Sequence, residues 1–197
     1  MVISLKFLPL VLVVPFLSQC ASIKPQGSSD QAKRDFIDKE ASMILAKLKK
    51  QTPNSTKQIA DAEGVAVFRY SSAKLPIILG GIGGGSGYGV AVDKSDESHT
   101  YMKVQKINWG VGMGARDNSV IFVFTDREVF SKFRRGKWDG GASAEATVKA
   151  NGMGADVGGI ATIKKGFTAY TLTEAGLSYG VTYQTRRFTP IDSLNKN

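Results

Sequence analysis

The chain has 197 residues, of which 42% are hydrophobic and 22% are charged, values typical of one globular domain and not of a disordered chain or a polytopic membrane protein. Its 26 Lys and Arg residues outnumber its 17 Asp and Glu residues, and the net charge of +9 favours an anionic partner without identifying it. One Cys and one His exclude an internal disulfide framework, a Cys-cluster metal site and a multi-His metal centre.

The N-terminal segment has the pattern of a secretory signal peptide. A weakly basic start precedes the apolar run 7–17, and Cys20 follows soon after it. A membrane-spanning helix needs about 20 apolar residues, whereas this run is shorter and contains Pro9 and Pro15. We therefore expect export, with 1–19 as the signal peptide, in preference to a permanent transmembrane anchor.

The residues before Cys20 resemble the lipobox of bacterial lipoproteins, Leu-Ser-Gln-Cys here. In that family the Cys thiol receives a diacylglyceryl group, the peptide is cut before the Cys, and the new amino terminus is acylated. The resemblance implies that Cys20 is lipidated and holds the protein on a membrane of the bacterial cell envelope. Gln19 departs from the Gly, Ala or Ser preferred there, and Ala21 in place of Asp fits the outer membrane, facing the periplasm. An ordinary exported protein and an uncleaved anchor are the alternatives.

The mature chain is predicted to form one domain between two short flanking segments. Residues 20–29 are polar and contain Pro and Gly, so we expect a flexible lipidated tether. The periodic segments that follow place a single domain at 30–190. The last residues, 191–197, are expected to be a C-terminal tail.

Two helices are predicted first. Apolar residues recur at three- and four-residue steps over 36–48, and Asp30 is a candidate for the N-cap. Thr52 followed by Pro53 is a second helix start, and Gly64 is the expected stop. The apolar stripe of the first helix suits packing against a sheet. Because Lys and Arg flank the stripe, a membrane-surface helix is the alternative.

From residue 65 onward, short runs rich in Val, Ile, Thr, Phe and Tyr alternate with turn residues, which predicts an antiparallel sheet. The predicted strands span 65–70, 88–92, 100–107, 120–124, 144–149, 167–172 and 177–184. A short helix interrupts them, with Asp126 as its cap, 127–135 as its body and Gly136 as its stop. The fold class is α+β: two N-terminal helices, then a Gly-rich, largely antiparallel sheet, with curling toward a barrel as one option.

The glycine-rich run 80–89 suggests a phosphate loop, but its spacing argues against one. A Walker loop needs Lys and Ser or Thr after the last Gly, and a dinucleotide fingerprint needs Gly where Tyr88 stands. Glycines at alternate positions, such as Gly87 and Gly89, are predicted to share one face of a strand. There they allow a close approach, for which we favour packing over a ligand cavity.

The order of several segments resembles the SYLF domain, over about residues 33–188. The segments are 64–68 after a helix, the glycine-rich stretch to 89–92, 109–112, 126–138 and 176–181. That family is named for lipid-binding proteins, and a yeast member binds actin. The resemblance implies an α+β domain without known catalysis or cofactor that binds acidic phospholipids.

The densest basic and aromatic cluster of the chain lies at 130–138. Its candidate lipid-binding residues are Lys132, Arg134, Arg135, Lys137 and Trp138. At a membrane surface the four cations would meet headgroup phosphates while the Trp sits at the interface. The alternative is that two Phe residues anchor this helix to the sheet and leave the cations as its solvated outer face. Binding to nucleic acid fits the composition but not an exported protein.

No residues of the chain form a recognisable catalytic motif, so we do not expect an enzyme. His99 lies in the polar stretch 93–100 and is expected to be an exposed loop residue. The sequence therefore predicts a lipid-anchored envelope protein that contacts acidic phospholipids through basic surface patches. A structural or protein-interaction lipoprotein that binds an acidic envelope protein or lipopolysaccharide is the alternative.

Overall fold

The computed structural model describes residues 23–75, 81–110, 114–137, 159–164, 166–173 and 183–196. The predicted signal peptide, Cys20, Trp138 and the strand expected at 144–149 lie outside the described residues. Within the described part of the chain, no helix is both long enough and apolar enough to cross a membrane.

The two N-terminal helices are α1 (Asp30–Gln51) and α2 (Ser55–Ala60). The cap of α1 is Ser29, so the prediction of Asp30 was wrong by one residue. Ser29 has extended backbone angles, and its hydroxyl accepts the amide of the third residue on, Ala32, at 3.1 Å. The predicted bounds of the second helix were also wrong. α2 begins at Ser55, after the predicted start at Thr52 and Pro53, and the predicted stop, Gly64, is the first residue of a strand.

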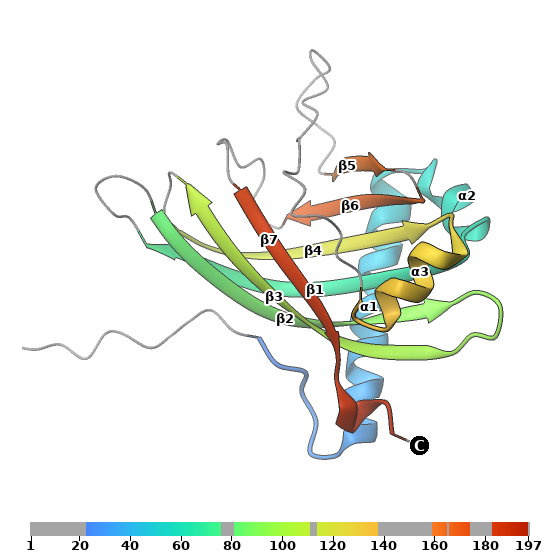
Figure 1. Cartoon of the computed structure of the whole chain (residues 1–197), viewed down its shortest axis with the longest axis horizontal. Helices are drawn as coiled ribbons and strands as arrows, with labels where there is room; N and C mark the ends of the chain where they lie inside the picture. The colour runs from blue at the N-terminus through green and yellow to red at the C-terminus, as the bar shows by residue number, and fades with distance from the viewer. Residues whose placement is uncertain are drawn as a thin grey trace, which may run out of the picture.

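Seven antiparallel strands form one sheet, in the order β5-β6-β4-β1-β2-β3-β7 (Figure 1). The strands are β1 (Gly64–Leu75), β2 (Gly81–Asp93), β3 (His99–Gly110), β4 (Gly114–Phe124), β5 (Gly159–Lys164), β6 (Phe167–Thr173) and β7 (Tyr183–Pro190). This arrangement confirms the α+β class and the antiparallel sheet. In the described strands the sheet is curved but open, with β5 and β7 at its edges, so it does not close into a barrel.

Two edge strands show where the sequence pattern was weakest. β5 was not predicted, because its short run Gly-Ile-Ala-Thr-Ile-Lys is hard to distinguish from a loop. Of the strand expected at 177–184, residues 177–182 lie outside the described residues. The described strand β7 continues to Pro190, beyond the predicted end at 184, through the adjacent charges Arg186 and Arg187. Charged residues and Pro are tolerated at an edge, where one side of the strand has no neighbour to pair with.

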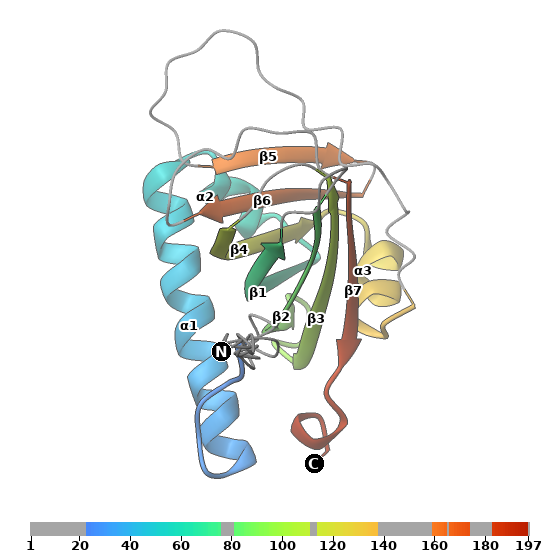
Figure 2. The same cartoon turned by 90° about the vertical axis from the view of Figure 1, so that its left-hand side faces the viewer.

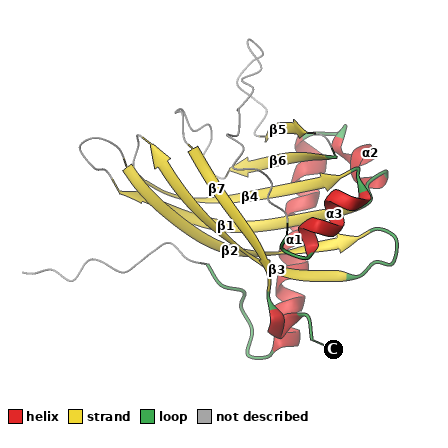
Figure 3. Ribbon diagram, viewed as in Figure 1, coloured by secondary structure: helices red, strands yellow, loops and turns green. Residues whose placement is uncertain are grey.

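The helices cover opposite faces of the sheet (Figures 2 and 3). One face packs against α1 and α2, and its buried sheet residues are Val65, Val67, Tyr88, Val90, Tyr101, Ile121, Val123, Tyr170 and Leu172. The other face packs against α3 (Arg127–Arg134), and its buried sheet residues are Ala66, Phe68, Tyr70, Ala91, Met102, Val104, Val120, Phe122, Phe124, Phe167, Ala169 and Phe188. Alternate residues of each strand supply the two cores.

Three alternate glycines of β2 allow the sheet to curl toward the α3 side. A Cβ added at Gly89 would lie 2.1 Å from the carbonyl oxygen of Val67, and Gly85 and Gly87 meet the backbone of β1 in the same way. The predicted packing role is therefore confirmed at these positions. Because the curl brings distant strands together, the ring of Phe68 on β1 lies 4.6 Å from that of Phe188 on β7, centroid to centroid.

The segment expected to be a C-terminal tail is part of the domain. It contains a short 3-10 helix, η1 (Asp192–Leu194), and Leu194 is buried in the core on the α1 side. The Asn195 side chain accepts the backbone N–H of Tyr101 at 2.9 Å and donates to the carbonyl of the same residue at 2.8 Å. Arg34 of α1 donates to the carbonyl of Leu194 at 3.0 Å, so the segment joins α1 to β3.

Candidate functional site

The predicted basic cluster lies on and just after α3, whose two ends form as the sequence indicated. Asp126 caps the helix by accepting two backbone N–H groups, at 2.8 and 3.0 Å. At the other end Gly136 has a φ of +68°, and its amide and the next one donate to the carbonyls of Phe133 and Lys132. This is a Schellman ending, which glycine favours because it adopts a positive φ without strain.

Two phenylalanines hold α3 against the sheet. Phe130 and Phe133 are both fully buried. The ring of Phe133 lies 4.9 Å from that of Phe124 and 5.2 Å from that of Phe188, while Phe130 lies 5.3 Å from Phe124. The interpretation of these residues as anchors is confirmed. The anchors fix the rotation of the helix, so its polar residues face outward.

A buried carboxylate adds a second attachment of α3. Asp93, at the end of β2, is 1% exposed and receives two hydrogen bonds from Arg127, at 2.6 and 2.9 Å. Arg134 donates to the same carboxylate at 2.6 Å, and Ser95 donates through both its amide and its hydroxyl. The hydrogen bonds from Arg127 and Ser95 hold the pKa of Asp93 well below its usual range, although burial opposes them.

The predicted lipid-binding residues therefore differ in their environments. Arg134 is engaged with the buried Asp93, which removes it from the set of cations available to a surface partner. Lys132 pairs with Glu128 at 2.7 Å across one helical turn. Arg135 and Lys137 are exposed and make no ion pair with a described residue, while Trp138 lies outside the described residues.

The charge around α3 is nearly balanced. The helix, its flanking residues 126–137 and the adjoining turn 93–98 carry six cations and five carboxylates. The cations are Lys94, Arg127, Lys132, Arg134, Arg135 and Lys137, and the carboxylates are Asp93, Asp96, Glu97, Asp126 and Glu128. We call this group of residues the α3 end. Its dense basic sequence thus yields a net charge of only one.

The outer side of α1 presents a different pattern. Ile37, Ala41 and Leu48 are buried against the sheet, which confirms the core role predicted for the apolar stripe. The exposed cations of this helix include Lys39, Lys47, Lys49 and Lys50. None of these four makes an ion pair with a described residue.

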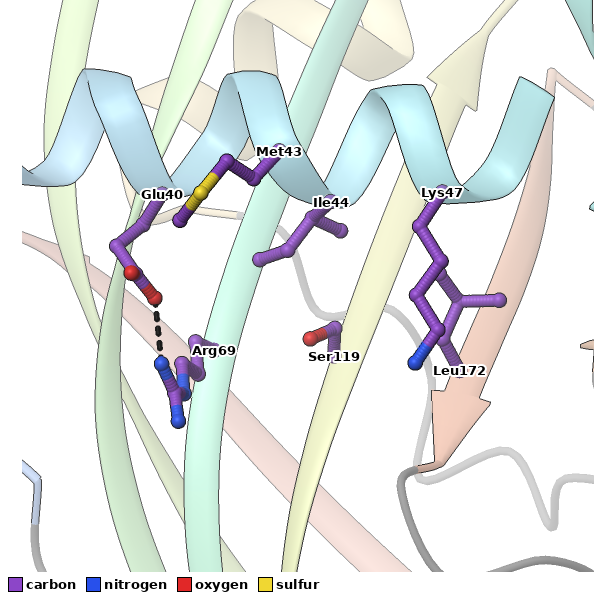
Figure 4. Close-up of a pocket in the computed structure, with 7 residues that line it drawn as sticks. All are labelled: Glu40, Met43, Ile44, Lys47, Arg69, Ser119 and Leu172. Carbon is purple, nitrogen blue, oxygen red and sulfur yellow. Dashed lines mark hydrogen bonds and ion pairs between the residues drawn. The ribbon is translucent and has the colours of Figure 1, made fainter. Parts of the chain in front are cut away.

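A shallow groove of about 150 Å³ lies along one side of α1, where the helix meets the sheet (Figure 4). Glu40, Met43, Ile44 and Lys47 line it from the helix, and Arg69, Ser119 and Leu172 line it from β1, β4 and β6. Arg69 donates to Glu40 at 2.6 Å, and this hydrogen bond raises the pKa of the Arg69 guanidinium. Arg69 and Glu40 therefore neutralise each other in the groove. Its lining residues do not converge on a position where a reacting atom could bind.

His99 is exposed, as predicted, but it is the first residue of β3 and not a loop residue, and it lies near α1. Its Nδ1 is 3.1 Å from Oδ1 of Asp38, and the Tyr101 hydroxyl donates to Oδ2 of Asp38 at 2.8 Å. Burial and the nearby Asp38 carboxylate raise the pKa of Tyr101. The cluster joins α1 to β3, and sequence analysis missed it because Asp38 is 61 residues from His99.

Among the described residues, no group of three or more His, Cys, Asp or Glu side chains is placed to hold a metal ion.

No family model matches this chain. The chain is similar to Beta cell expansion factor A of Aeromonas veronii, with 29% identity over 144 residues. The aligned region covers 73% of this chain and 52% of that protein, so the chain spans about half the length of this relative.

Proposed function

We propose that this chain is an exported, lipid-anchored binding protein of the bacterial cell envelope, whose domain contacts acidic phospholipids through basic surface patches. The anchor is the acylated Cys20, which would hold the protein on the outer membrane, facing the periplasm. The position of the single Cys directly after a signal-like apolar run supports this proposal. The domain itself would be of the SYLF type, for which the segment order and the similarity to Beta cell expansion factor A are the support.

The observation that carries lipid contact is the exposure of cations without carboxylate partners among the described residues. Arg135 and Lys137 extend from the end of α3, and Lys39 and Lys47 are exposed on α1, Lys47 at the rim of its groove with the sheet. A cation near an anionic membrane surface contributes about 1 kcal/mol, so several acting together give measurable binding. This attraction is electrostatic and weakens with added salt.

The test is flotation of the unacylated protein, residues 22–197, with vesicles. We expect binding to vesicles rich in phosphatidylglycerol, no binding to phosphatidylcholine alone, and loss of binding at high salt. The double variant K39E/K47E should reduce binding, and R135E/K137E measures the contribution of the α3 end in the same assay. K57E, which reverses an exposed charge on α2, is the matched control. Equal binding to both vesicle types at all salt concentrations would refute lipid recognition by the domain.

A second candidate function is a structural or protein-interaction lipoprotein that binds an acidic envelope partner. The near balance of cations and carboxylates at the α3 end favours it there, because alternating charges suit a specific protein surface better than a uniformly anionic membrane. Crosslinking in cells separates the two functions. A reproducible protein partner that is lost in R135E/K137E, while flotation is unchanged, would assign the α3 end to protein binding.

A further inference from the structure

The two basic surfaces of the domain lie on opposite faces of the sheet, so a flat bilayer can contact only one of them closely (Figure 2). The proposed anchor determines which one, because it fixes one point of the domain near the membrane. The inference below rests on the proposed function, in that it takes Cys20 as the lipidated residue.

The described chain begins on the α1 side of the sheet. Ile23 is partly buried against the same core as Phe36 and Val92. A few residues later Gly27 has a φ of +139°, and a Cβ there would lie 2.8 Å from the backbone of Ala32. The segment before α1 is therefore packed on the domain at both of these points. Figures 1 and 2 show the start of the described chain, just before α1, on the face that α1 covers and away from α3.

The free part of the tether is consequently short. Three residue steps separate Cys20 from Ile23 and span at most about 11 Å when fully extended. A helix with its side chains is about 10–12 Å across, and α3 lies beyond the whole thickness of the sheet. A link of this length places the α1 side at the membrane and does not bring α3 to it.

Charge on the α1 side agrees with this placement. Lys103 and Arg187 share it, because Lys103 is two residues from Tyr101 of the α1-side core, and Arg187 pairs with Gln105. We define the α1 face as the charged residues of 23–51 together with those on this side of the sheet. Its cations are Lys24, Lys33, Arg34, Lys39, Lys47, Lys49, Lys50, Arg69, Lys103 and Arg187, and its carboxylates are Asp30, Asp35, Asp38, Glu40 and Asp117.

The α1 face, as defined by these residues, thus has ten cations and five carboxylates, a net charge of five. We infer that the α1 face lies against the anionic bilayer that holds the acylated Cys20, and that α3 points away from that bilayer. The two faces then have separate roles: the α1 face contacts lipid, and the α3 end is open to partners on the far side.

Lysine footprinting tests this orientation, because lysines lie on both faces. The full-length processed protein is placed in phosphatidylglycerol vesicles and, for comparison, in detergent micelles. It is then treated with an acetylating reagent that does not cross membranes, and mass spectrometry measures the modification of each lysine. We expect Lys39, Lys47 and Lys103 to react several-fold more slowly in vesicles than in micelles, with Lys132 and Lys137 unchanged. Protection of the α3 lysines instead, or equal protection on both faces, would overturn the inference.

The variant I23S tests the role of the packed tether. It should free residues 23–29, lengthen the flexible link, and reduce the difference between the two faces, whereas Q26S at an exposed position should not. Circular dichroism checks that I23S remains folded. A preference as strong in I23S as in the wild type would overturn the argument from tether length.

The same mass spectra separate this inference from the proposed function. If the N-terminal peptide carries no acyl groups, the proposed natural anchor is refuted. The orientation can still be measured in that case. The thiol of Cys20, the single Cys of the chain, is coupled to a maleimide-linked lipid in the protein that carries no acyl groups. Footprinting of the coupled protein then distinguishes protection of the α1-face lysines, which supports the inference, from protection of the α3 lysines, which overturns it.

Discussion

The two helices that cover the sheet differ in the contacts that attach them to it. α3 has 8 residues, yet it buries two phenylalanines and joins the end of β2 through a buried carboxylate. α1 has 22 residues and buries three aliphatic side chains, with Phe36, Ile44 and Leu45 partly buried against the same core. From this comparison we expect the side chains that a helix buries, and not its length, to determine how tightly it is held.

The same comparison explains the charges. At the α3 end, Arg127 and Arg134 neutralise Asp93, so cations that look available in the sequence are part of the internal structure. On α1, the exposed lysines have no such carboxylate opposite them. The most conspicuous basic cluster in the sequence therefore offers fewer free cations in the folded protein than its residue types suggest.

The largest expected effect is the loss of an aromatic anchor. Phe133→Ala should lower the free energy of unfolding by about 4 kcal/mol, because it leaves a cavity among Phe68, Phe122, Phe124 and Phe188. Ile44→Ala, at a half-buried position of α1, should lower the free energy of unfolding by about 1–2 kcal/mol. Urea unfolding measures both. Equal losses would contradict the difference in attachment between the two helices.

Asp93→Asn should follow, with a loss of about 3 kcal/mol, because it leaves Arg127 and Arg134 without their buried countercharge. The exposed Glu97→Gln is the control, since its ion pair with Lys94 is long, at 4.0 Å.

The acid dependence of stability provides a second measurement on the same variant. Because the folded pKa of Asp93 is lowered, its contribution is present above its unfolded pKa of about 3.9 and is lost as the pH falls toward the folded value. Wild type should therefore lose stability below about pH 4 more steeply than Asp93→Asn. Parallel acid profiles would show that the carboxylate is not coupled to folding.

The smallest effect is expected where α1 meets β3. Tyr101→Phe removes the hydrogen bond to Asp38 and should cost about 1 kcal/mol at neutral pH. Since the folded pKa of Tyr101 is raised, its contribution is complete below its unfolded pKa of about 10 and falls as the pH rises above it. The variant should accordingly lose less stability than wild type in alkaline thermal unfolding. A loss as large as that of Asp93→Asn would show that the Tyr101–Asp38 contact of α1 stabilises the fold as much as the Asp93 contacts of α3.

Local features of the sequence predicted the parts of the fold that depend on neighbouring residues. The cap at Asp126, the glycine ending at Gly136 and the alternation of Gly87 and Gly89 each lie within one turn or one strand. The anchoring role of Phe130 and Phe133 also followed from their spacing on one helix. The strand β5 and the far end of β7 were missed, because short edge strands carry little periodic signal.

The sequence by itself determined the fold class, the position of α3 and the excess of positive charge, since composition and short-range periodicity encode all three. Only the tertiary structure decided that Arg134 faces Asp93, that His99 and Tyr101 meet Asp38, and that α1 and α3 cover opposite faces. These partners are 41 to 63 residues apart along the chain, and the packing of α1 and α3 on the sheet brings them together. Contacts of that kind depend on the register and curl of the whole sheet, which no local pattern specifies.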